Sequence, residues 1–351
     1  MPTDLPLSRR HLLQASAAAA STLMLSRSSP ARHEPTTAPD LIIHNARVTT
    51  LTPGGADAQA VATVGGHIVA VGASEQIRAL ATPATVQIDA RNRRIIPGLS
   101  DSHTHAVRGG LNYAMEVRWE GVPSLAEALE MLRQQARRTP EGQWIRVVGG
   151  WSWTQFREQR MPTLDEINAV APETPVFVLF VYSIAQLNRA ALRYLGIDRH
   201  FPDDRYPGGK IERDASGDPT GVLLADPSAL ILYSTLHNGP KLERQDQLVS
   251  SRHFMKELNR LGITHTLDCG GGFQNWPDDY TVVQELHRRR EMSLRIGVST
   301  FIQRPGRELE DFTHWTQRFT ASEGDDMLYL LGGGEMLVRS IYDFEVWGMP
   351  Q

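Results

Sequence analysis

Residues 94–105 read RIIPGLSDSHTH, an apolar segment that leads directly into a His-x-His pair. We expect a β-strand over Ile95–Leu99, with the pair at its carboxyl end. Side chains alternate between the two faces of a strand, so His103 and His105 are expected to point the same way. Two imidazoles on one face can bind one divalent metal ion. A bare His-x-His pair is a weak signal, so the flanking sequence has to carry the interpretation.

A small β region precedes this stretch. The segments Leu41–Ile43 and Ala46–Val48 read as short strands. A hairpin is expected from Ala58–Val64 and His67–Gly72, because Gly65-Gly66 between them is typical of a tight turn. Residues 40–94 are therefore predicted to form a small β-domain of their own.

Strands alternate with helices after residue 240. The strands are expected at Ile263–Asp268, Leu294–Phe301 and Met327–Leu331, with helices near 245–261, 280–290 and 308–319. This alternation is typical of a parallel sheet with helices on its faces. With the strand at Ile95–Leu99 the count of sheet strands is four. Residues of about 110–240 read as an α+β insertion.

The N-terminus resembles an export signal. Arg9 and Arg10 precede an apolar, alanine-rich run from Leu12 to Leu25, too short to span a bilayer comfortably. The paired arginines indicate the twin-arginine route, with residues 1–31 as signal peptide and linker. We therefore expect a periplasmic or extracellular protein with no stable membrane span after signal removal. The other interpretation of this segment is a disordered tail.

Composition excludes some classes of function. The chain of 351 residues has a formal net charge of −4, which gives no electrostatic support for nucleic-acid binding. Cys269 is its one cysteine, so no intrachain disulfide can form. Lysine occurs only at Lys210, Lys241 and Lys256, none of them near the fourth expected sheet strand.

Several spaced segments, taken together, resemble one family. Pro97-Gly98-Leu99 and the following DSHTH resemble the first-strand signature of the amidohydrolase superfamily. Residues 148–152 (VGGWS), 188–192 (NRAAL) and 207–221 resemble segments of its amidohydrolase family 3, the YtcJ-like branch. The resemblance covers most of the chain after residue 40.

The resemblance implies an α/β fold, a (β/α)8 TIM-like barrel with its active site at the carboxyl ends of the strands. It also implies that residues 40–94 are part of a small β-sandwich. Because only four barrel strands are counted, residues 95–351 are expected to form the N-terminal half of a barrel, incomplete at its C-terminal side. Unpaired sheet edges and an uncovered apolar face are then expected.

The same resemblance implies a metal centre and a reaction. His103 and His105 would bind a divalent metal, with zinc as the expected ion and one or two ions in a complete family member. Glu335 falls where many members have a bridging lysine, so it is the third candidate ligand; its other interpretation is an exposed loop acid after Gly332-Gly333-Gly334. Metal-activated water would hydrolyse a carbon–nitrogen bond of a small amide-like substrate.

Other roles follow less directly. The family's general-base aspartate is expected beyond residue 351, so no catalytic base is assigned. Trp151 and Tyr182 are weak candidates for substrate binding, because aromatic packing explains them as well. His265 is expected inside the barrel, and His237, His253, His287 and His314 at the surface. The alternatives to an active hydrolase are an inactive, truncated remnant, a metal-binding or partner-binding protein, and a half-barrel completed by a second chain.

Overall fold

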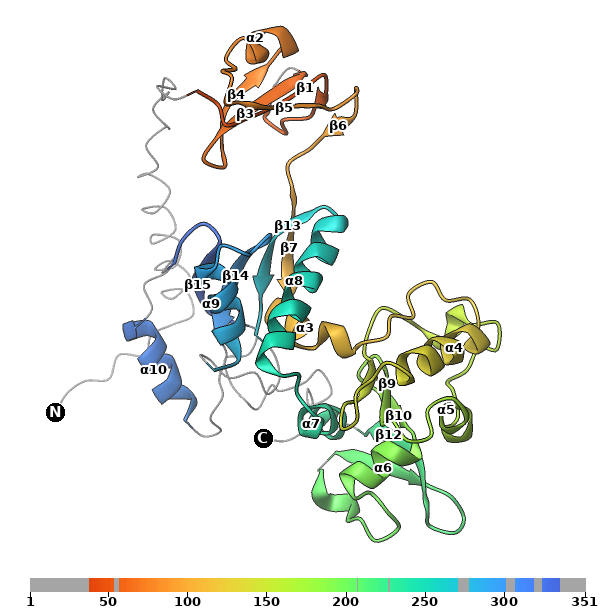
Figure 1. Cartoon of the computed structure of the whole chain (residues 1–351). Coiled ribbons are helices and arrows are strands. Elements are labelled where there is room, and N and C mark those ends of the chain that lie inside the picture. The colour runs from red at the N-terminus through yellow and green to blue at the C-terminus, as the bar shows by residue number, and fades with distance from the viewer. Residues whose placement is uncertain are drawn as a thin grey trace, which may run out of the picture. The chain divides into compact units, whose positions relative to one another are not determined.

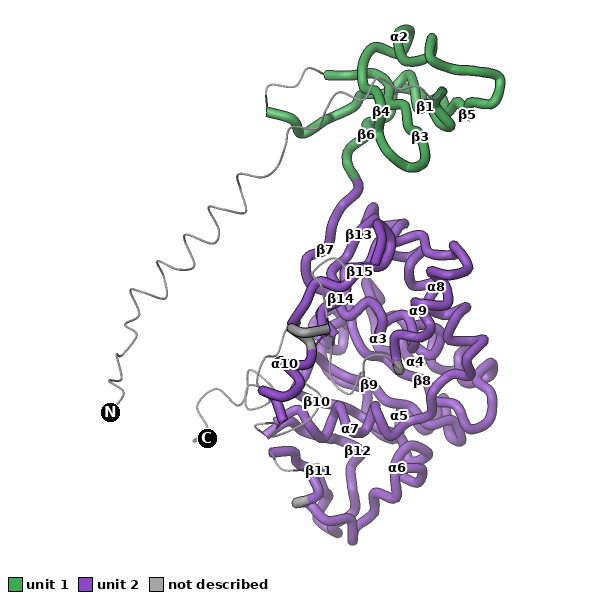
Figure 2. The backbone as a smooth tube through the Cα atoms, turned by 90° about the vertical axis from the view of Figure 1, so that its left-hand side faces the viewer, with its two compact units in different colours: residues 1–97 green, residues 98–351 purple. Residues whose placement is uncertain are grey.

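The computed structural model describes residues 38–53, 57–206, 208–226, 228–270, 278–300, 307–318 and 324–334. The chain divides into two compact units, residues 1–97 and residues 98–351, which Figure 2 distinguishes by colour. The fold is α/β. No helix in the described ranges is both long and apolar enough to cross a membrane.

The first unit is built around a four-stranded sheet in the order β4-β3-β1-β5. Its pairs β1–β3 and β3–β4 are antiparallel and β1–β5 is parallel, and a separate parallel pair joins β2 to β6. The elements are β1 (Leu41–His44), β2 (Arg47–Val48), β3 (Ala60–Val64), β4 (His67–Gly72), α2 (Ser74–Arg78), β5 (Val86–Asp89) and β6 (Arg94–Ile95).

Alternation along two strands gives this unit a small core on each face of the sheet. Ile42 of β1 packs with Ala60 and Ala62 of β3 and with Ile77 of helix α2. The residues of β1 and β3 that point the other way, Ile43 and Val61, belong to the opposite cluster. The hairpin expected around Gly65-Gly66 is confirmed.

Two sheets organise the second unit (Figure 1). Its elements are β7 (Leu99–Thr104), α3 (Ala106–Asn112), α4 (Leu125–Ala136), β8 (Ile145–Val147), α5 (Leu164–Val170), β9 (Val176–Phe180), β10 (Ile184–Leu187), α6 (Arg189–Leu195), β11 (Gly209–Arg213), β12 (Pro219–Ala225), α7 (Leu230–Asn238), α8 (Arg244–Arg260), β13 (Ile263–Asp268), α9 (Thr281–Arg288), β14 (Arg295–Thr300), α10 (Glu308–Arg318) and β15 (Leu328–Gly333).

A parallel sheet in the order β15-β14-β13-β7 carries the carboxyl ends that matter for the site. Helices α3, α8 and α9 bury one of its faces, with Ile296, Val298 and Leu330 in the shared core. Leu99 and Leu331 are 49% and 40% exposed in the described structure. The expected strands β13, β14 and β15 lie within one or two residues of their predicted positions. That these four strands are half of a barrel stays a prediction.

The first strand of this sheet was predicted in the wrong place. Residues Arg94–Ile95 form β6, which pairs with β2, and the sheet strand β7 covers Leu99–Thr104 instead of Ile95–Leu99. Pro97 lies between the two strands and has no N–H to donate. Gly98 follows, and a Cβ there would overlap the side chain of Thr264. The chain therefore changes sheets at Pro97-Gly98, and His103 belongs to the strand itself.

The insertion between β7 and α8 holds a mixed sheet in the order β11-β12-β10-β9-β8. Buried Asn188 fixes its centre, since its side-chain oxygen accepts from the N–H groups of Val176 and Ala191 at 3.0 Å each. Its amide nitrogen donates to the carbonyls of Ala171 and Thr174. Helix α6 therefore starts at a residue whose hydrogen-bonding groups are all used within the fold.

Strand β12 requires glycine at position 221. Gly221 has a φ of +85°, and a Cβ there would overlap the carbonyl oxygen of Leu187 in β10. Gly217, in the turn before β12, has a similar φ of +83° but no atom within 4 Å of such a Cβ. Comparing the two positions separates backbone strain from steric overlap.

We expect Gly221→Ala to destabilise the protein more than Gly217→Ala. The positive φ costs each variant about 1–2 kcal/mol, and overlap with a backbone atom adds roughly 1–3 kcal/mol at position 221 only. Urea unfolding followed by circular dichroism measures both. Equal losses of stability would mean that β10 and β12 can move apart at no cost.

Candidate active site

The carboxyl ends of the four parallel strands lie at one edge of their sheet. Cys269, just after β13, donates its N–H to the carbonyl of Thr104 at 2.8 Å. Thr300 at the end of β14 donates its hydroxyl to the carbonyl of Gly332 in β15 at 3.1 Å. These contacts hold the ends of neighbouring strands together, and His103 and His105 emerge at the same edge.

His103 and His105 are close enough to share an ion. Their ring centroids are 5.7 Å apart and the ring planes are at 86°. Two imidazoles on one tetrahedral ion have centroids roughly 5 Å apart, given metal–nitrogen bonds of about 2.0–2.1 Å. The N–H of His103 donates to the carboxylate of Asp101 at 3.0 Å, a local contact in the strand just before the pair. The pair therefore fits two ligand positions of one metal ion.

A hydrogen bond fixes the tautomer of His105. Its Nδ1 contacts the carbonyl oxygen of Gly270. A carbonyl can only accept, so Nδ1 carries the proton, and the lone pair of the neutral ring is on Nε2. Metal-binding histidines are commonly oriented by such a bond to a backbone carbonyl. In this tautomer, Nε2 is the ring nitrogen of His105 that can donate an electron pair.

Asp268 connects this edge to helix α3. His105 is the N-cap residue of α3 but makes no side-chain cap hydrogen bond. Instead, Oδ1 of Asp268 accepts from the N–H of Val107 at 3.0 Å, and Oδ2 accepts from the hydroxyl of Tyr280 at 3.1 Å. Asp268 is fully buried, and this burial raises its pKa to about 6, although both hydrogen bonds act to lower it. No role for Asp268 was predicted from sequence, where its place at the end of a strand is the only signal that points to one.

The complete ligand set is not found in the described part of the chain. No group of three or more His, Cys, Asp or Glu residues there could hold a metal ion together. Glu335, the third ligand expected from sequence, lies outside the described residues. Gly334 before it packs closely, since a Cβ there would come within 2.9 Å of Ser299 and of the Thr300 carbonyl.

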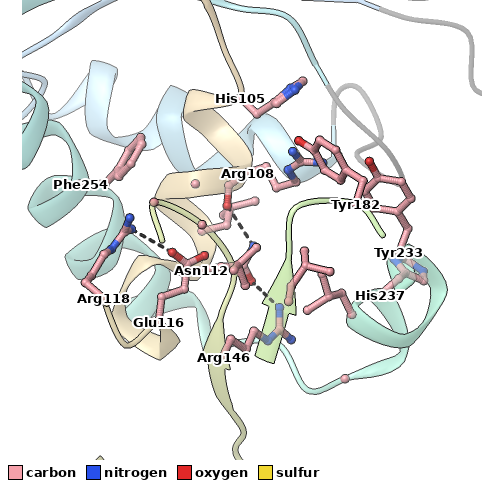
Figure 3. Close-up of a pocket in the computed structure, with 18 of the residues that line it drawn as sticks. His105, Arg108, Asn112, Glu116, Arg118, Arg146, Tyr182, Tyr233, His237 and Phe254 are labelled. Atoms are coloured by element: carbon pink, nitrogen blue, oxygen red, sulfur yellow. Dashed lines mark hydrogen bonds and ion pairs between the residues drawn. The ribbon is translucent and has the colours of Figure 1, made fainter. Parts of the chain in front are cut away.

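A cavity of about 650 Å³ opens beside His105 (Figure 3). It lies between helix α3, the strands β8 and β9 of the insertion, and helices α7 and α8. Its lining combines aromatic and aliphatic side chains with charged ones. The residues are His105, Arg108, Gly109, Leu111, Asn112, Glu116, Arg118, Glu120, Arg146, Val148, Gly149, Gly150, Trp151, Leu179, Val181, Tyr182, Tyr233, Leu236, His237, Gly239, Lys241, Gln247, Phe254 and Asp279.

Both aromatic candidates line this cavity, in different ways. Trp151 is 8% exposed, donates its indole N–H to the Leu179 carbonyl at 3.1 Å, and packs in an aromatic cluster. Its role in packing is therefore clear. Tyr182 is 41% exposed, and its ring lies 5.7 Å from that of Tyr233. Figure 3 shows both tyrosines on one side of the cavity.

The histidines expected elsewhere are found as follows. His265 is half-buried and bonded to Ser100 and Tyr329, at 2.5 and 2.7 Å. His237 is exposed as expected, yet it also lines the cavity, a position that the sequence did not reveal. His253 and His314 are exposed, whereas His287 is partly buried and lies 2.8 Å from Asp325.

Comparison with known proteins gives a consistent family. A family model described as "Amidohydrolase family" matches residues 87–349. An N-substituted formamide deformylase of Arthrobacter pascens is 35% identical over 233 residues, covering 66% of this chain and 42% of that protein. The protein LONG AFTER FAR-RED 3 of Arabidopsis thaliana is 28% identical over 264 residues, covering 74% and 44%. The chain thus spans less than half the length of these two relatives.

A solved structure supports the fold. An uncharacterised metal-dependent hydrolase from Pyrococcus horikoshii matches with a TM-score of 0.55 and 18% sequence identity. The match covers 84% of this chain and 53% of that one. At this identity the likeness concerns the fold.

We expect Asp268→Ala to lower the free energy of unfolding by roughly 2–4 kcal/mol, because two buried donors, on Val107 and Tyr280, lose their acceptor. Urea unfolding followed by tryptophan fluorescence measures the change. Glu173→Ala is the control: Glu173 is 86% exposed in its pair with Arg193, so its loss should stay within about 0.5–1 kcal/mol. Equal effects of the two variants would show that the Asp268 contacts add nothing.

Asp268 should also make stability depend on pH. Its folded-state pKa, about 6, is above its ordinary value of 3.8, so its contribution is complete below about pH 4. That contribution is lost as pH rises through about 6, amounting to at most about 3 kcal/mol. In metal-free protein, the stability of wild type relative to Asp268→Asn should therefore fall between pH 4 and pH 7. A stability difference between wild type and Asp268→Asn that stays constant from pH 4 to pH 7 would contradict this prediction.

Proposed function

The chain belongs to the amidohydrolase family, and we propose that it acts in a metal-dependent hydrolase, supplying the first metal ligands and the site for a small amide-like substrate. The reaction is hydrolysis of a carbon–nitrogen bond that is not a peptide bond. One observation carries the proposal: His103 and His105 lie side by side at the carboxyl edge of a parallel sheet, with the tautomer of His105 set by Gly270.

The residues that would hold the metal are His103 and His105, joined by Glu335 from outside the described part of the chain. A bound divalent ion, with zinc as our proposal, would activate water and polarise the carbonyl of the substrate. The chain's own part is to orient these ligands. Gly270 orients the imidazole of His105, and Asp268 holds the first turn of α3 behind it. No general base is assigned among the described residues.

The cavity beside His105 is the proposed substrate site. Its volume of about 650 Å³ is within the usual range for small-molecule pockets, roughly 300–1,000 Å³. Tyr182 and Trp151 supply aromatic surface on its insertion side. N-substituted formamides are the first substrates to test, because of the similarity to the Arthrobacter deformylase.

Two further proposals concern the organisation of the chain. We propose that residues 1–31 direct export by the twin-arginine route, on the basis of Arg9-Arg10 and the apolar run that follows. We also propose that residues 40–94 are part of a β-sandwich and that residues 95–351 are the first half of a (β/α)8 barrel. A second chain that supplies the other half stays an alternative.

Metal binding tests the proposed centre directly. Zinc titrated into metal-free protein against a chelating indicator should bind wild type, and His105→Ala should lose at least about a hundredfold in affinity, because even an outer hydrogen-bonding partner is worth 10–100-fold. Glu335→Gln should weaken binding in the same direction. His253→Ala is the control, since His253 is exposed on α8. Unchanged affinity in His105→Ala would exclude the site.

The zinc-loaded chain is then offered N-benzylformamide, and released amine is measured with and without EDTA. Metal-dependent release that His105→Ala abolishes supports hydrolysis. Zinc binding without amine release favours the second candidate function, a metal-binding protein without catalytic activity of its own.

A further inference from the structure

The cavity beside His105 has more basic than acidic side chains. Its basic residues are Arg108, Arg118, Arg146 and Lys241, and its acidic residues are Glu116, Glu120 and Asp279. Protein cavities seldom keep an excess of buried charge without a ligand or partner that balances it. The excess is at least one positive charge, and it is larger if buried Glu116 is protonated.

Most of these charges are balanced within the protein. Arg118 lies 2.8 Å from Glu116 and 3.6 Å from Glu120, so both carboxylates flank one guanidinium. Lys241 lies 3.8 Å from Asp279. Neither Arg108 nor Arg146 forms an ion pair with any described residue. The excess positive charge therefore lies on the side of these two arginines, where the charge of Glu116 offsets part of it without an ion-pair contact.

Arg146 on β8 is the more unusual of the two. It is 6% exposed, and it donates to the Asn112 side chain at 3.3 Å and to the Pro240 carbonyl at 2.9 Å, both neutral acceptors. Its Nε atom is buried with no hydrogen-bond partner. Burial lowers the pKa of Arg146 to about 10, opposed by the charge of Glu116. An anion in the cavity would stabilise an arginine in this position, because it would offset the cost of burying the charge.

Arg108 and Arg146 are linked through Asn112. The Asn112 amide nitrogen donates to the Arg108 carbonyl at 2.9 Å, while its oxygen accepts from Arg146. Figure 3 shows Asn112 between the two arginines, with both hydrogen bonds dashed. Arg108 lies on α3, three residues after His105. Arg108 thus lies on the α3 side of the cavity, next to His105, and Asn112 connects it to Arg146 on the wall that faces α3.

We propose that Arg146 and Arg108 form a carboxylate-binding subsite in this cavity, so that the amide substrate carries a carboxylate away from the bond that is cleaved. That the substrate is an amide rests on the proposed function, whereas the carboxylate-binding subsite does not depend on it. A guanidinium matches the planar carboxylate with a fork of N–H donors. Leu179, Tyr182 and Tyr233 supply apolar surface for an organic group next to it.

Binding of phenylacetate and of neutral 2-phenylacetamide to the full, metal-free chain tests the subsite. Both titrations are followed by tryptophan fluorescence and by thermal unfolding at constant ionic strength. We expect wild type to bind phenylacetate at least about tenfold more tightly than the amide. Arg146→Met and Arg108→Met should lose this preference. Arg193→Met, in an exposed ion pair on α6, should keep it.

Equal affinity for the two ligands in wild type would overturn the proposal, and so would an unchanged preference in Arg108→Met. If circular dichroism shows that Arg146→Met does not fold, Arg108→Met decides alone. The assay needs no metal and no turnover. A carboxylate preference in a chain that hydrolyses nothing would count against the proposed function and for the subsite. Hydrolysis of neutral formamides by a chain that shows no carboxylate preference would support the proposed function and contradict the subsite.

Discussion

The buried carboxylate of Asp268 joins the segments on which the site depends. It ends β13, yet it serves as the hydrogen-bond acceptor for the first turn of α3, whose own N-cap residue is His105. A histidine that bonds its ring to Gly270 cannot also cap its helix, so a neighbouring strand has to supply the cap. The position of His105 thus depends on two contacts that both come from the end of β13.

Much of the fold could be predicted from sequence because it follows from local patterns. The strand Ile263–Asp268 and the hairpin around Gly65-Gly66 each follow from a pattern of neighbouring residues in the sequence. The strand before the histidine pair was misplaced for a physical reason. Apolar Ile95 and Ile96 suggested one strand up to Leu99, whereas Pro97 and the contact of Gly98 with Thr264 divide the chain between two sheets. That contact involves a residue far along the sequence, so no local pattern contains it.

The candidate site also has a part that could be predicted from sequence and a part that could not. The histidine pair was found because the two candidate ligands lie two residues apart in the sequence, His103 in β7 and His105 directly after it. Asp268, His237 and Arg146 come from other elements, and only the fold brings them to α3 or to the cavity. The burial of Arg146 could not be predicted from the apolar residues around it in β8, because a charged residue in a strand usually indicates solvent exposure. Its 6% exposure is a property of the folded insertion and of the Asn112 contact.

The insertion therefore forms part of the candidate site. Its strands β8 and β9 and helix α7 provide the wall of the cavity that faces α3, including Arg146, Tyr182 and His237. A hydrogen-bonded arginine buried among neutral acceptors contributes little to stability, because its desolvation opposes those bonds. Its retention in the cavity wall is explained more simply by a ligand than by folding. The parallel sheet would then set where the bond is cleaved, while the insertion would select which molecule is held there.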